Sequence, residues 1–568
     1  MAEPLPMATG EGSREYLVVF AMHAMYFNMR FQELEALARL CGVYSREELY
    51  AESPPPTSLC DSPLVRIRLP SEAAARLICA RAVLVKAVLE VWCQGPNFPD
   101  AVAAGLACDA SLLAERRATI APPATMHVRV VCFGRTITME EKNVAIEQLK
   151  PLFRGDEKVD IHNSDAIIWA LEEHSHLTRE KTHLGPRTSQ PRQVVVARQV
   201  AGGRSVDKKM KDGEKCFFHR YDLSERAVLG PTTMDNQLAF IMANCACASQ
   251  GQLGMDPFCG TGGLAIGMAH FGVRTVGGEI DIRVAKGYRV AYVKNKEAAR
   301  AVARQRAAGS GEAIEELETN AGQTSALTLK HLSEIGIFRG LPGAAEAGQF
   351  SRHAKAGLPM DVFVNFEQYN LLKPDIVVCD AAKRPWRDVC GGWLDCIVTD
   401  PPYGVRAASK KLGRSDEGDG DGPSGALKVG YGEEELSRDL LDLAATSLRD
   451  HGRIVYLFPV DLADLLGIDR SAEHGDEVVD CAAGRKKRNG GSERTLRDVA
   501  MPKQGRAFKD PRLCISETTR DPRIIGEASF DDFIPRHPDL QLLSASMQVL
   551  SGGLGRLLVT MSRRPRDA

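Results

Sequence analysis

The segment MDPFCGTGGLAIGMAHFG at residues 255–272 constrains the fold of this chain more than any other. Its apolar start predicts a short strand that ends at Asp256, and its glycines predict a tight turn. The apolar residues 264–271 then predict a helix. A strand, a glycine-rich turn and a helix in this order are typical of nucleotide-binding α/β folds.

The turn itself indicates what kind of ligand it could hold. Glycine at Gly260, Gly262 and Gly263 removes the Cβ atoms that would keep a ligand away from the backbone N–H groups. The spacing is GTGG after an acidic residue and not GxGxxG, so dinucleotide binding is the weaker interpretation. Taken alone, the turn is also compatible with a purely structural role.

Two further carboxylates follow predicted strands. VRTVGGEID places Glu279 at the end of the next strand, about twenty residues on, where a carboxylate can accept from both hydroxyls of a ribose. Asp281 is expected to cap the helix that follows. VVCDA places Asp380 at another strand end, where it can accept from an adenine amine or cap a turn, and both alternatives stay open.

The sharpest signal is CIVTDPPYGVRA, in which an apolar strand runs directly into Asp400, Pro401, Pro402 and Tyr403. Two consecutive prolines stiffen the exit from the strand, so a carboxylate and a backbone carbonyl face outward. Such a pair can accept both N–H groups of a planar exocyclic amine, while the tyrosine ring stacks on the heterocycle. These four residues are the predicted catalytic group.

Composition and charge exclude several classes of protein. The 568 residues carry 72 Lys+Arg against 74 Asp+Glu, so no global basic field marks a nucleic-acid partner. The 15 cysteines include no CxxC pair, which argues against a disulfide framework or zinc ribbon, and we predict no metal site. The chain shows neither a signal-peptide pattern nor an apolar run of membrane-spanning length. We expect a cytoplasmic protein, with a nuclear pool as an open alternative.

Strands alternate with helices over residues 14–176, which predicts an α+β module. Within it, residues 71–95 are predicted as one long helix that begins after a Ser71 N-cap. Residues 177–222 are predicted as a basic linker, because 178–220 hold 11 basic and 4 acidic side chains. Residues 223–568 are predicted as an α/β domain that closes with a helix or strand and carries inserts at about 297–357, 411–424 and 470–525.

At these motifs the sequence resembles the class I, Rossmann-like S-adenosylmethionine-dependent methyltransferases that carry an Asp/Asn-Pro-Pro-aromatic motif. FCGTGG, TDPPYGVR, LGPTTMDNQLAFIMANCA and FIPRHPDLQLLSASMQ together resemble the tRNA guanosine-10 N2-methyltransferase family. The first 176 residues are similar to that family's ferredoxin-like segment and THUMP RNA-binding domain. The inserts depart from the family pattern.

The resemblance implies S-adenosylmethionine as cofactor and assigns residues to it. Asp256 and the glycine turn would hold the methionine part, Glu279 the ribose and Asp380 the adenine. Thr233 and Asp235 match a family element beside the cofactor, although a helix N-cap explains them equally well. The implied cofactor-binding residues are Thr233, Asp235, Asp256, Phe258, Gly260, Thr261, Gly262, Glu279, Asp380 and Ala381.

The resemblance also implies a reaction and partners. The expected reaction is methylation of the N2 amine of a guanosine in tRNA, and the expected partners are tRNA and a small zinc-binding activator subunit. Three alternatives stay open: methylation of adenine in DNA, methylation of a protein glutamine, and an inactive RNA-binding homologue.

Overall fold

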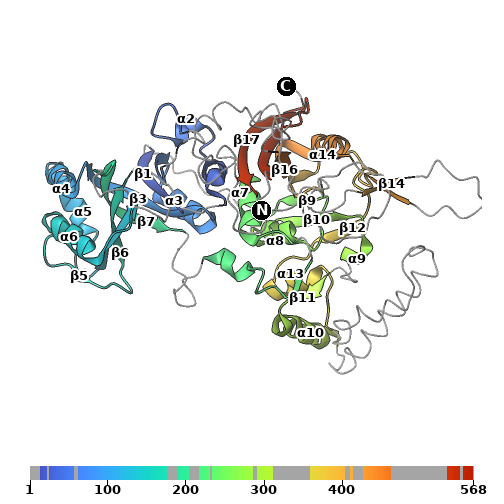
Figure 1. The fold of residues 1–568 in the computed structure, drawn as a ribbon, viewed down its shortest axis with the longest axis horizontal. Coiled ribbons are helices and arrows are strands. Elements are labelled where there is room, and N and C mark those ends of the chain that lie inside the picture. Colours follow the sequence, from blue (N-terminus) through green and yellow to red (C-terminus); the bar gives the residue numbers. More distant parts are fainter. Residues whose placement is uncertain are drawn as a thin grey trace, which may run out of the picture. The chain divides into compact units, whose positions relative to one another are not determined.

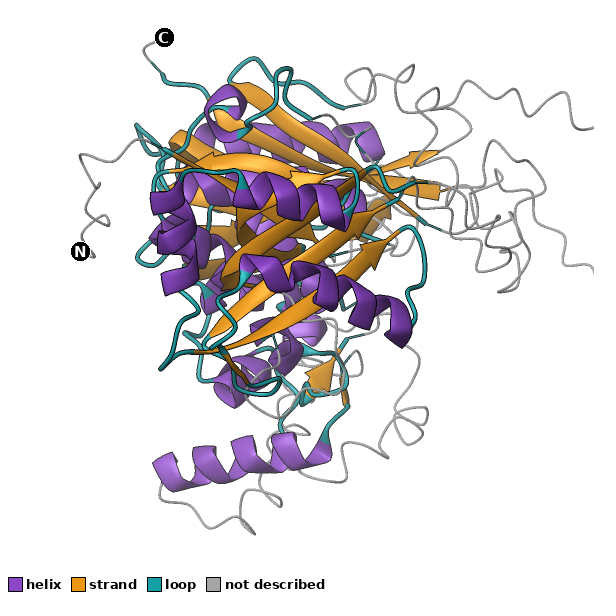
Figure 2. Ribbon diagram, turned by 90° about the vertical axis from the view of Figure 1, so that its left-hand side faces the viewer, coloured by secondary structure: helices purple, strands orange, loops and turns teal. Residues whose placement is uncertain are grey.

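The computed structural model describes fourteen stretches of the chain, namely residues 13–21, 25–56, 60, 62–174, 190–203, 216–230, 233–285, 291–310, 358–402, 410–413, 427–430, 432–461, 534–550 and 554–566. They fall into two compact units, one up to residue 216 and one from residue 217 onward. Both units combine helices with strands (Figure 1, Figure 2). Within the described ranges, no helix is long and apolar enough to cross a membrane.

The first unit contains a seven-stranded sheet in the order β2-β1-β3-β7-β6-β4-β5. Its strands are β1 (Arg14–Phe20), β2 (Leu64–Leu69), β3 (Val85–Gly95), β4 (Thr125–Phe133), β5 (Lys158–Val159), β6 (Ala166–Glu173) and β7 (Gln193–Gly202). Its helices are η1 (Phe27–Met29), α1 (Arg30–Leu40), α2 (Arg46–Leu49), α3 (Glu72–Arg81), α4 (Phe98–Leu106), α5 (Ala110–Ala118), α6 (Met139–Leu149) and η2 (Lys150–Leu152). The predicted α+β class is confirmed.

The prediction of a single helix over 71–95 is wrong in its second half. Helix α3 begins after the predicted cap, Ser71, and ends at Arg81, and β3 follows after three residues. The buried carboxylate of Glu33 accepts the backbone N–H groups of Val83 (2.9 Å) and Leu84 (2.8 Å), so these groups cannot continue a helix. The valines that follow are β-branched and favour a strand.

The predicted linker also contains an unforeseen strand. Strand β7 lies between β3 and β6 within the sheet, with antiparallel pairing on both sides. Consecutive residues of VVVA at 194–197 are all buried, because both faces of this part of the sheet are covered. The sequence did not predict this strand, because its short apolar segment lies within a stretch that is rich in basic residues. The linker is therefore shorter than predicted.

The second unit is built on a seven-stranded sheet in the order β12-β10-β9-β13-β16-β18-β17. Its first five strands are parallel. Strand β18 pairs antiparallel with both β16 and β17, so it alone runs against the other strands of this sheet. The strands are β9 (Leu253–Asp256), β10 (Arg274–Glu279), β12 (Asp375–Val378), β13 (Leu394–Thr399), β16 (Leu448–Asp461), β17 (Leu540–Val549) and β18 (Leu554–Arg563). The chain order reverses between β9 and β13, as in the Rossmann-like fold that the sequence predicted.

Helices and two small ribbons complete this unit. The helices are η3 (Phe217–Tyr221), α7 (Asn236–Cys245), α8 (Gly263–His270), α9 (Ile282–Ala285), α10 (Lys296–Ser310), α13 (Phe363–Tyr369) and α14 (Glu433–Ser447). The ribbons pair β8 (Val228–Leu229) with β11 (Tyr292–Val293), and β14 (Lys410–Gly413) with β15 (Leu427–Gly430).

The structure describes only parts of the predicted inserts. The first insert begins with helix α10, which is tied to the domain because Arg306 pairs with Asp361 and Glu367. The second begins within β14. The third, at about 470–525, lies outside the described residues. The closing apolar run forms two strands, β17 and β18.

Candidate functional site

The predicted carboxylates meet at the carboxyl edge of the second sheet. Asp256 and Glu279 end β9 and β10, and Asp400 directly follows β13. These strands are parallel neighbours, so their ends lie at the same edge of the sheet; β9 and β10 are labelled in Figure 1. This edge is the topological switch point, where open α/β sheets bind their ligands.

Asp256 is the buried centre of this group, with 1% of its surface exposed. Its Oδ1 atom accepts from the backbone N–H of Phe258 (3.1 Å) and from the hydroxyl of Thr399 (2.7 Å). These bonds fix the glycine turn to the end of β13. Burial raises the pKa of Asp256 to about 7, and the neighbouring carboxylates of Asp400 and Glu279 add to the rise.

The raised pKa of Asp256 predicts a pH-dependent stability. The folded protein keeps this proton at pH values where the unfolded chain, with an ordinary pKa of 3.8, has lost it. The free energy of unfolding of the cofactor-free protein should therefore fall between pH 4 and 7, by up to about 4 kcal/mol. In Asp256→Asn, whose amide oxygen can accept the same two bonds, this fall should be absent. Urea unfolding across this pH range tests the assignment, and an equally steep fall in the variant contradicts it.

The glycine turn is clamped by Glu279. Oε2 of Glu279 accepts from the backbone N–H of Gly260 (3.1 Å), and Oε1 accepts from that of Asp281 (2.8 Å). Gly260 has φ +52°, and no described atom lies within 4 Å of the Cβ position it lacks. Gly262, at φ +80°, is the N-cap of helix α8. The turn is therefore open to a ligand at Gly260 and fixed by a carboxylate beside it.

Three other predicted acidic residues act as caps. Asp281 accepts the N–H of Arg283 (2.9 Å) and pairs with its guanidinium, as predicted. Asp235 caps α7 by accepting the N–H groups of Gln237 and Leu238. Asp380, which is buried, accepts the N–H of Ala382 (3.0 Å). Capping is therefore observed for all three, and a ligand contact of Asp235 or Asp380 stays a prediction.

Thr233 reaches the glycine turn from the segment before α7. Its hydroxyl donates to the carbonyl of Gly230 (2.9 Å) and lies 3.3 Å from the hydroxyl of Thr261. Phe258, partly buried, packs beside the buried Leu436 of α14. Ala381 is half-buried in the turn that Asp380 caps. Of these three residues, Thr233 is thus placed beside the glycine turn, although it precedes Thr261 of that turn by 28 residues.

The structure describes three of the four predicted catalytic residues at the exit from β13. Pro401 is buried and Pro402 is partly exposed, while the Asp400 side chain is 39% exposed. Nη1 of Arg556 lies 3.9 Å from Oδ2 of Asp400. Tyr403 lies outside the described residues. No motif in the sequence predicted Arg556, because it lies 156 residues from Asp400 along the chain.

Arg226 is a second residue that the sequence did not reveal. It is 1% exposed, and its Nε donates to the carbonyl of Tyr221 (3.2 Å). Its Nη1 has no hydrogen-bond partner in the described part of the chain and lies 3.8 Å from the Cβ position that Gly263 lacks. Burial lowers the pKa of Arg226. The buried guanidinium of Arg226 therefore lies next to Gly263, the first residue of α8.

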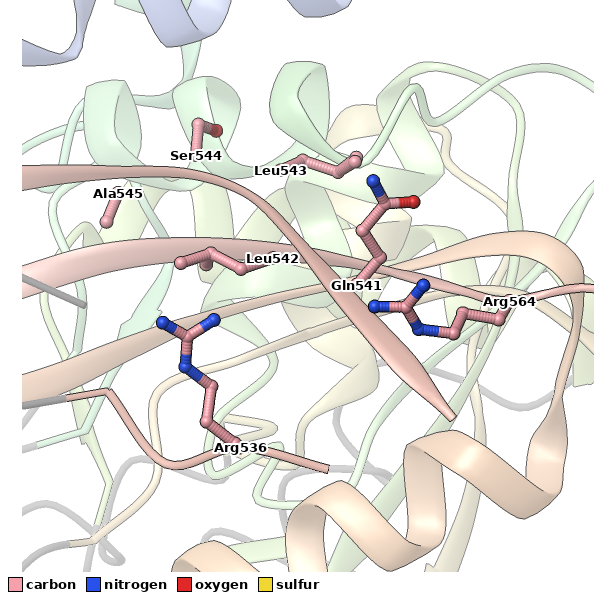
Figure 3. Close-up of a pocket in the computed structure, with 7 residues that line it drawn as sticks. All are labelled: Arg536, Gln541, Leu542, Leu543, Ser544, Ala545 and Arg564. Carbon is pink, nitrogen blue, oxygen red and sulfur yellow. The ribbon is translucent and has the colours of Figure 1, made fainter. Parts of the chain in front are cut away.

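A pocket of about 400 Å³ lies along the edge strand β17. Figure 3 shows the exposed side chains of Arg536 and Arg564 beside it, with Gln541, Leu542 and Ser544 of the strand. Two guanidinium groups next to backbone and amide groups favour a polyanionic ligand over an apolar one.

One cluster in the first unit has a composition that could hold a metal ion. Cys132, Glu172 and His174 offer ligand atoms within 4.8 Å of one another. Arg135, however, donates to both Glu172 oxygens (3.0 and 3.2 Å) and to Nε2 of His174 (3.1 Å). The guanidinium takes the acceptors that a cation would need, so this cluster is a hydrogen-bonded network.

Comparisons with known proteins agree with this architecture. Residues 14–205, which include β7, match the Tmrp11 THUMP N-terminal domain, and residues 224–332 match the RMKL-like methyltransferase domain. The chain is similar to the protein named tRNA (guanine(10)-N(2))-methyltransferase TRMT11. It is 27% identical to the Xenopus laevis protein over 80% of this chain and 78% of that one. It is 27% identical to the Homo sapiens protein over 78% and 79%.

Among the solved structures with which this chain can be aligned is TrmN from Thermus thermophilus. The alignment has a TM-score of 0.33 and 14% sequence identity, and it covers 97% of this chain and 100% of that one.

Proposed function

We propose that this chain, a member of the THUMP-containing tRNA guanine N2-methyltransferase family, transfers a methyl group from S-adenosylmethionine to the N2 amine of a guanosine in tRNA. The relatives are named for guanine 10, which we propose as the target position. The observation that carries the proposal is the position of Asp400, at a strand exit stiffened by two prolines and at the same sheet edge as the glycine turn.

The residues present fit S-adenosylmethionine. We assign the ribose hydroxyls to Glu279, the adenine to Asp380 and the methionine part to Asp256 and the turn that it fixes. Nη1 of Arg226, which has no hydrogen-bond partner among the described residues, and the amino end of α8 suit an anionic group, which supports binding of the methionine carboxylate there. When bound, the cofactor supplies the methyl group on a sulfonium, which is already a strong electrophile.

The assignment of Arg226 predicts a selective loss of affinity. Arg226→Met should weaken binding of S-adenosylhomocysteine by about 10- to 100-fold, because a charged hydrogen bond to the carboxylate is lost. Binding of 5′-methylthioadenosine, which has no carboxylate, should change less than about twofold. Isothermal titration of both ligands tests this. Equal weakening of both would indicate general damage to the turn and refute the assignment.

The chain's own part in the reaction is to position and to stabilise charge. Asp400 and the carbonyl of Pro401 each accept one N–H of the guanine amine, so its lone pair points toward the methyl group. This alignment lowers the barrier by several kcal/mol. The carboxylate stabilises the positive charge that grows on the amine, and the proton leaves to water. The target base has to leave its stack to reach this edge, and Tyr403 is assigned to receive it.

The THUMP domain and local basic groups support tRNA as the partner. The chain is nearly neutral overall, so phosphates have to be met by local charge. The pocket beside β17, with Arg536 and Arg564, is one such place (Figure 3). We also propose a small zinc-binding activator subunit, by family resemblance. The terminal strand β12, with its exposed Val378 and the nearby exposed Leu372, offers an apolar edge for it.

Three other functions were open from the sequence. The match of residues 14–205 to a THUMP domain supports an RNA substrate over DNA or a release factor. The presence of Asp256, Glu279 and Asp400 at one edge supports an enzyme over an inactive binder. Transfer of a labelled methyl group to unmodified tRNA, DNA and release factor in parallel tests the proposal. Label in tRNA alone is expected, and label only in DNA or protein would overturn it.

A further inference from the structure

Arg556 is a largely buried arginine beside Asp400. It stands on β18 opposite Pro459 of β16, and β16 is the parallel neighbour of β13, the strand that leads into Asp400. The Arg556 side chain is 14% exposed, and its Nη1 lies 3.9 Å from Oδ2 of Asp400. At this distance, which is longer than a direct hydrogen bond, the two groups form a loose ion pair. A donor group therefore borders the carboxylate that is proposed to hold the guanine amine.

Gln548 holds this guanidinium in place. It faces Arg556 across the β17–β18 ladder and is wholly buried. Its Oε1 accepts from Nε of Arg556 at 2.6 Å. Its amide nitrogen has no hydrogen-bond partner in the described part of the chain. An arginine fixed by a buried acceptor loses little further conformational entropy when it binds a ligand, so Arg556 is arranged in advance to donate from its Nη atoms.

The pairing of a carboxylate with a neighbouring guanidinium complements guanine. Guanine carries a donor amine at C2 and an acceptor oxygen, O6, with N7 beside it as a second acceptor. Arginine is the commonest side-chain partner of these two acceptors. Adenine has no amine at C2 and carries an amine where guanine carries O6. The donor groups of Arg556 would then face the donor amine of adenine, which is unfavourable. An acceptor at Asp400 next to donors at Arg556 thus favours guanine.

We propose that Arg556, held by Gln548, determines base specificity by donating to O6 of the target guanine while Asp400 accepts from its amine. This inference rests on the proposed methylation of guanosine N2. It differs from a purely positioning role, in which Arg556 would only orient Asp400. The two roles make different predictions for a base that keeps the amine and lacks O6.

The test uses tRNA transcripts with guanosine or 2-aminopurine riboside at the target position, because both bases carry the amine at C2. Wild-type protein should prefer guanosine in kcat/KM. Arg556→Met should reduce that preference by about 5- to 150-fold, the discrimination typical of one arginine–guanine contact. Arg556→Lys should keep part of it. Arg274→Met removes an arginine that is 73% exposed at the opposite end of β10, and should leave the preference unchanged.

The outcomes separate this inference from the proposed function. If Arg556→Met lowers turnover equally on both transcripts, Arg556 only positions Asp400 and the inference is wrong. If the variant turns over neither transcript, the affinities of both transcripts in the presence of S-adenosylhomocysteine give the same comparison without chemistry. A preference equal to wild type in that measurement also refutes it. If wild-type protein methylates neither transcript, the proposed function itself fails.

Discussion

Replacing Asp400 by alanine is expected to lower kcat for methyl transfer to tRNA by about 100- to 1,000-fold, the usual effect of removing one group aimed at developing charge. The carboxylate is proposed to align the amine and to stabilise its growing positive charge, and both effects act on the chemical step. The affinity for S-adenosylhomocysteine should stay within about twofold of wild type, because Asp400 is not assigned to the cofactor. Single-turnover kinetics and isothermal titration measure the two quantities.

Asp395 provides a matched control on the same strand. It lies near the opposite end of β13, where its Oδ2 accepts the backbone N–H of Leu253 (2.7 Å) and its Oδ1 pairs with Arg449. Asp395→Asn should lower the free energy of unfolding, because the ion pair with Arg449 is lost, and should leave the single-turnover rate of the folded protein unchanged. Normal turnover by Asp400→Ala, or equal loss in both variants, would contradict the assigned role of Asp400.

Replacing Glu279 by alanine is expected to raise the Kd for S-adenosylmethionine by about 100-fold or more. Two charged hydrogen bonds to the ribose would be lost, each worth about 1.5 to 3 kcal/mol. The change also releases the N–H groups of Gly260 and Asp281, which Glu279 now fixes. Isothermal titration with S-adenosylmethionine and with adenosine measures the loss, and both ligands should weaken because both contain the ribose.

Asp281→Asn is the control for this change, since Asp281 lies two residues on and caps a helix. It should cost about 1 kcal/mol of stability or less and leave the Kd nearly unchanged. If Glu279→Ala bound the cofactor as well as wild type, the ribose assignment would be wrong.

Much of the second domain follows from local sequence patterns. A strand that ends in an acidic residue, followed by glycines and an apolar helix, predicts the β9–turn–α8 unit because each piece has a distinct periodicity or turn chemistry. Parallel strands bring their carboxyl ends to one edge, so the meeting of Asp256 with Glu279 and Asp400 was also predictable. The capping role of Asp281 followed from its place before a helix.

The errors have physical causes. Residues 82–95 are mostly apolar, with only Lys86, Glu90 and Gln94 between the apolar residues, and such a segment does not separate a buried helix from a buried strand. The deciding contact is the Glu33 carboxylate, which lies about fifty residues away in sequence. Strand β7 was hidden because its pairing with β3 and β6 is non-local.

Arg226 and Arg556 could not be predicted from the sequence, for the same reason. Neither residue belongs to a sequence motif, and the role that we assign to each depends on the residue that lies beside it in the folded structure. For Arg226 this is the start of α8, and for Arg556 it is the carboxylate of Asp400. Local patterns therefore predict the strand-end carboxylates of the candidate site, while the basic side chains that complete it depend on tertiary packing.

The most direct test of the account is mass spectrometry of the nucleosides and nuclease fragments of unmodified tRNA incubated with the purified protein and S-adenosylmethionine, with and without the activator subunit. We expect N2-methylguanosine, located at guanosine 10, and its loss with Asp400→Ala. Methylation on another base or another atom of guanine, or none under either condition, would contradict it.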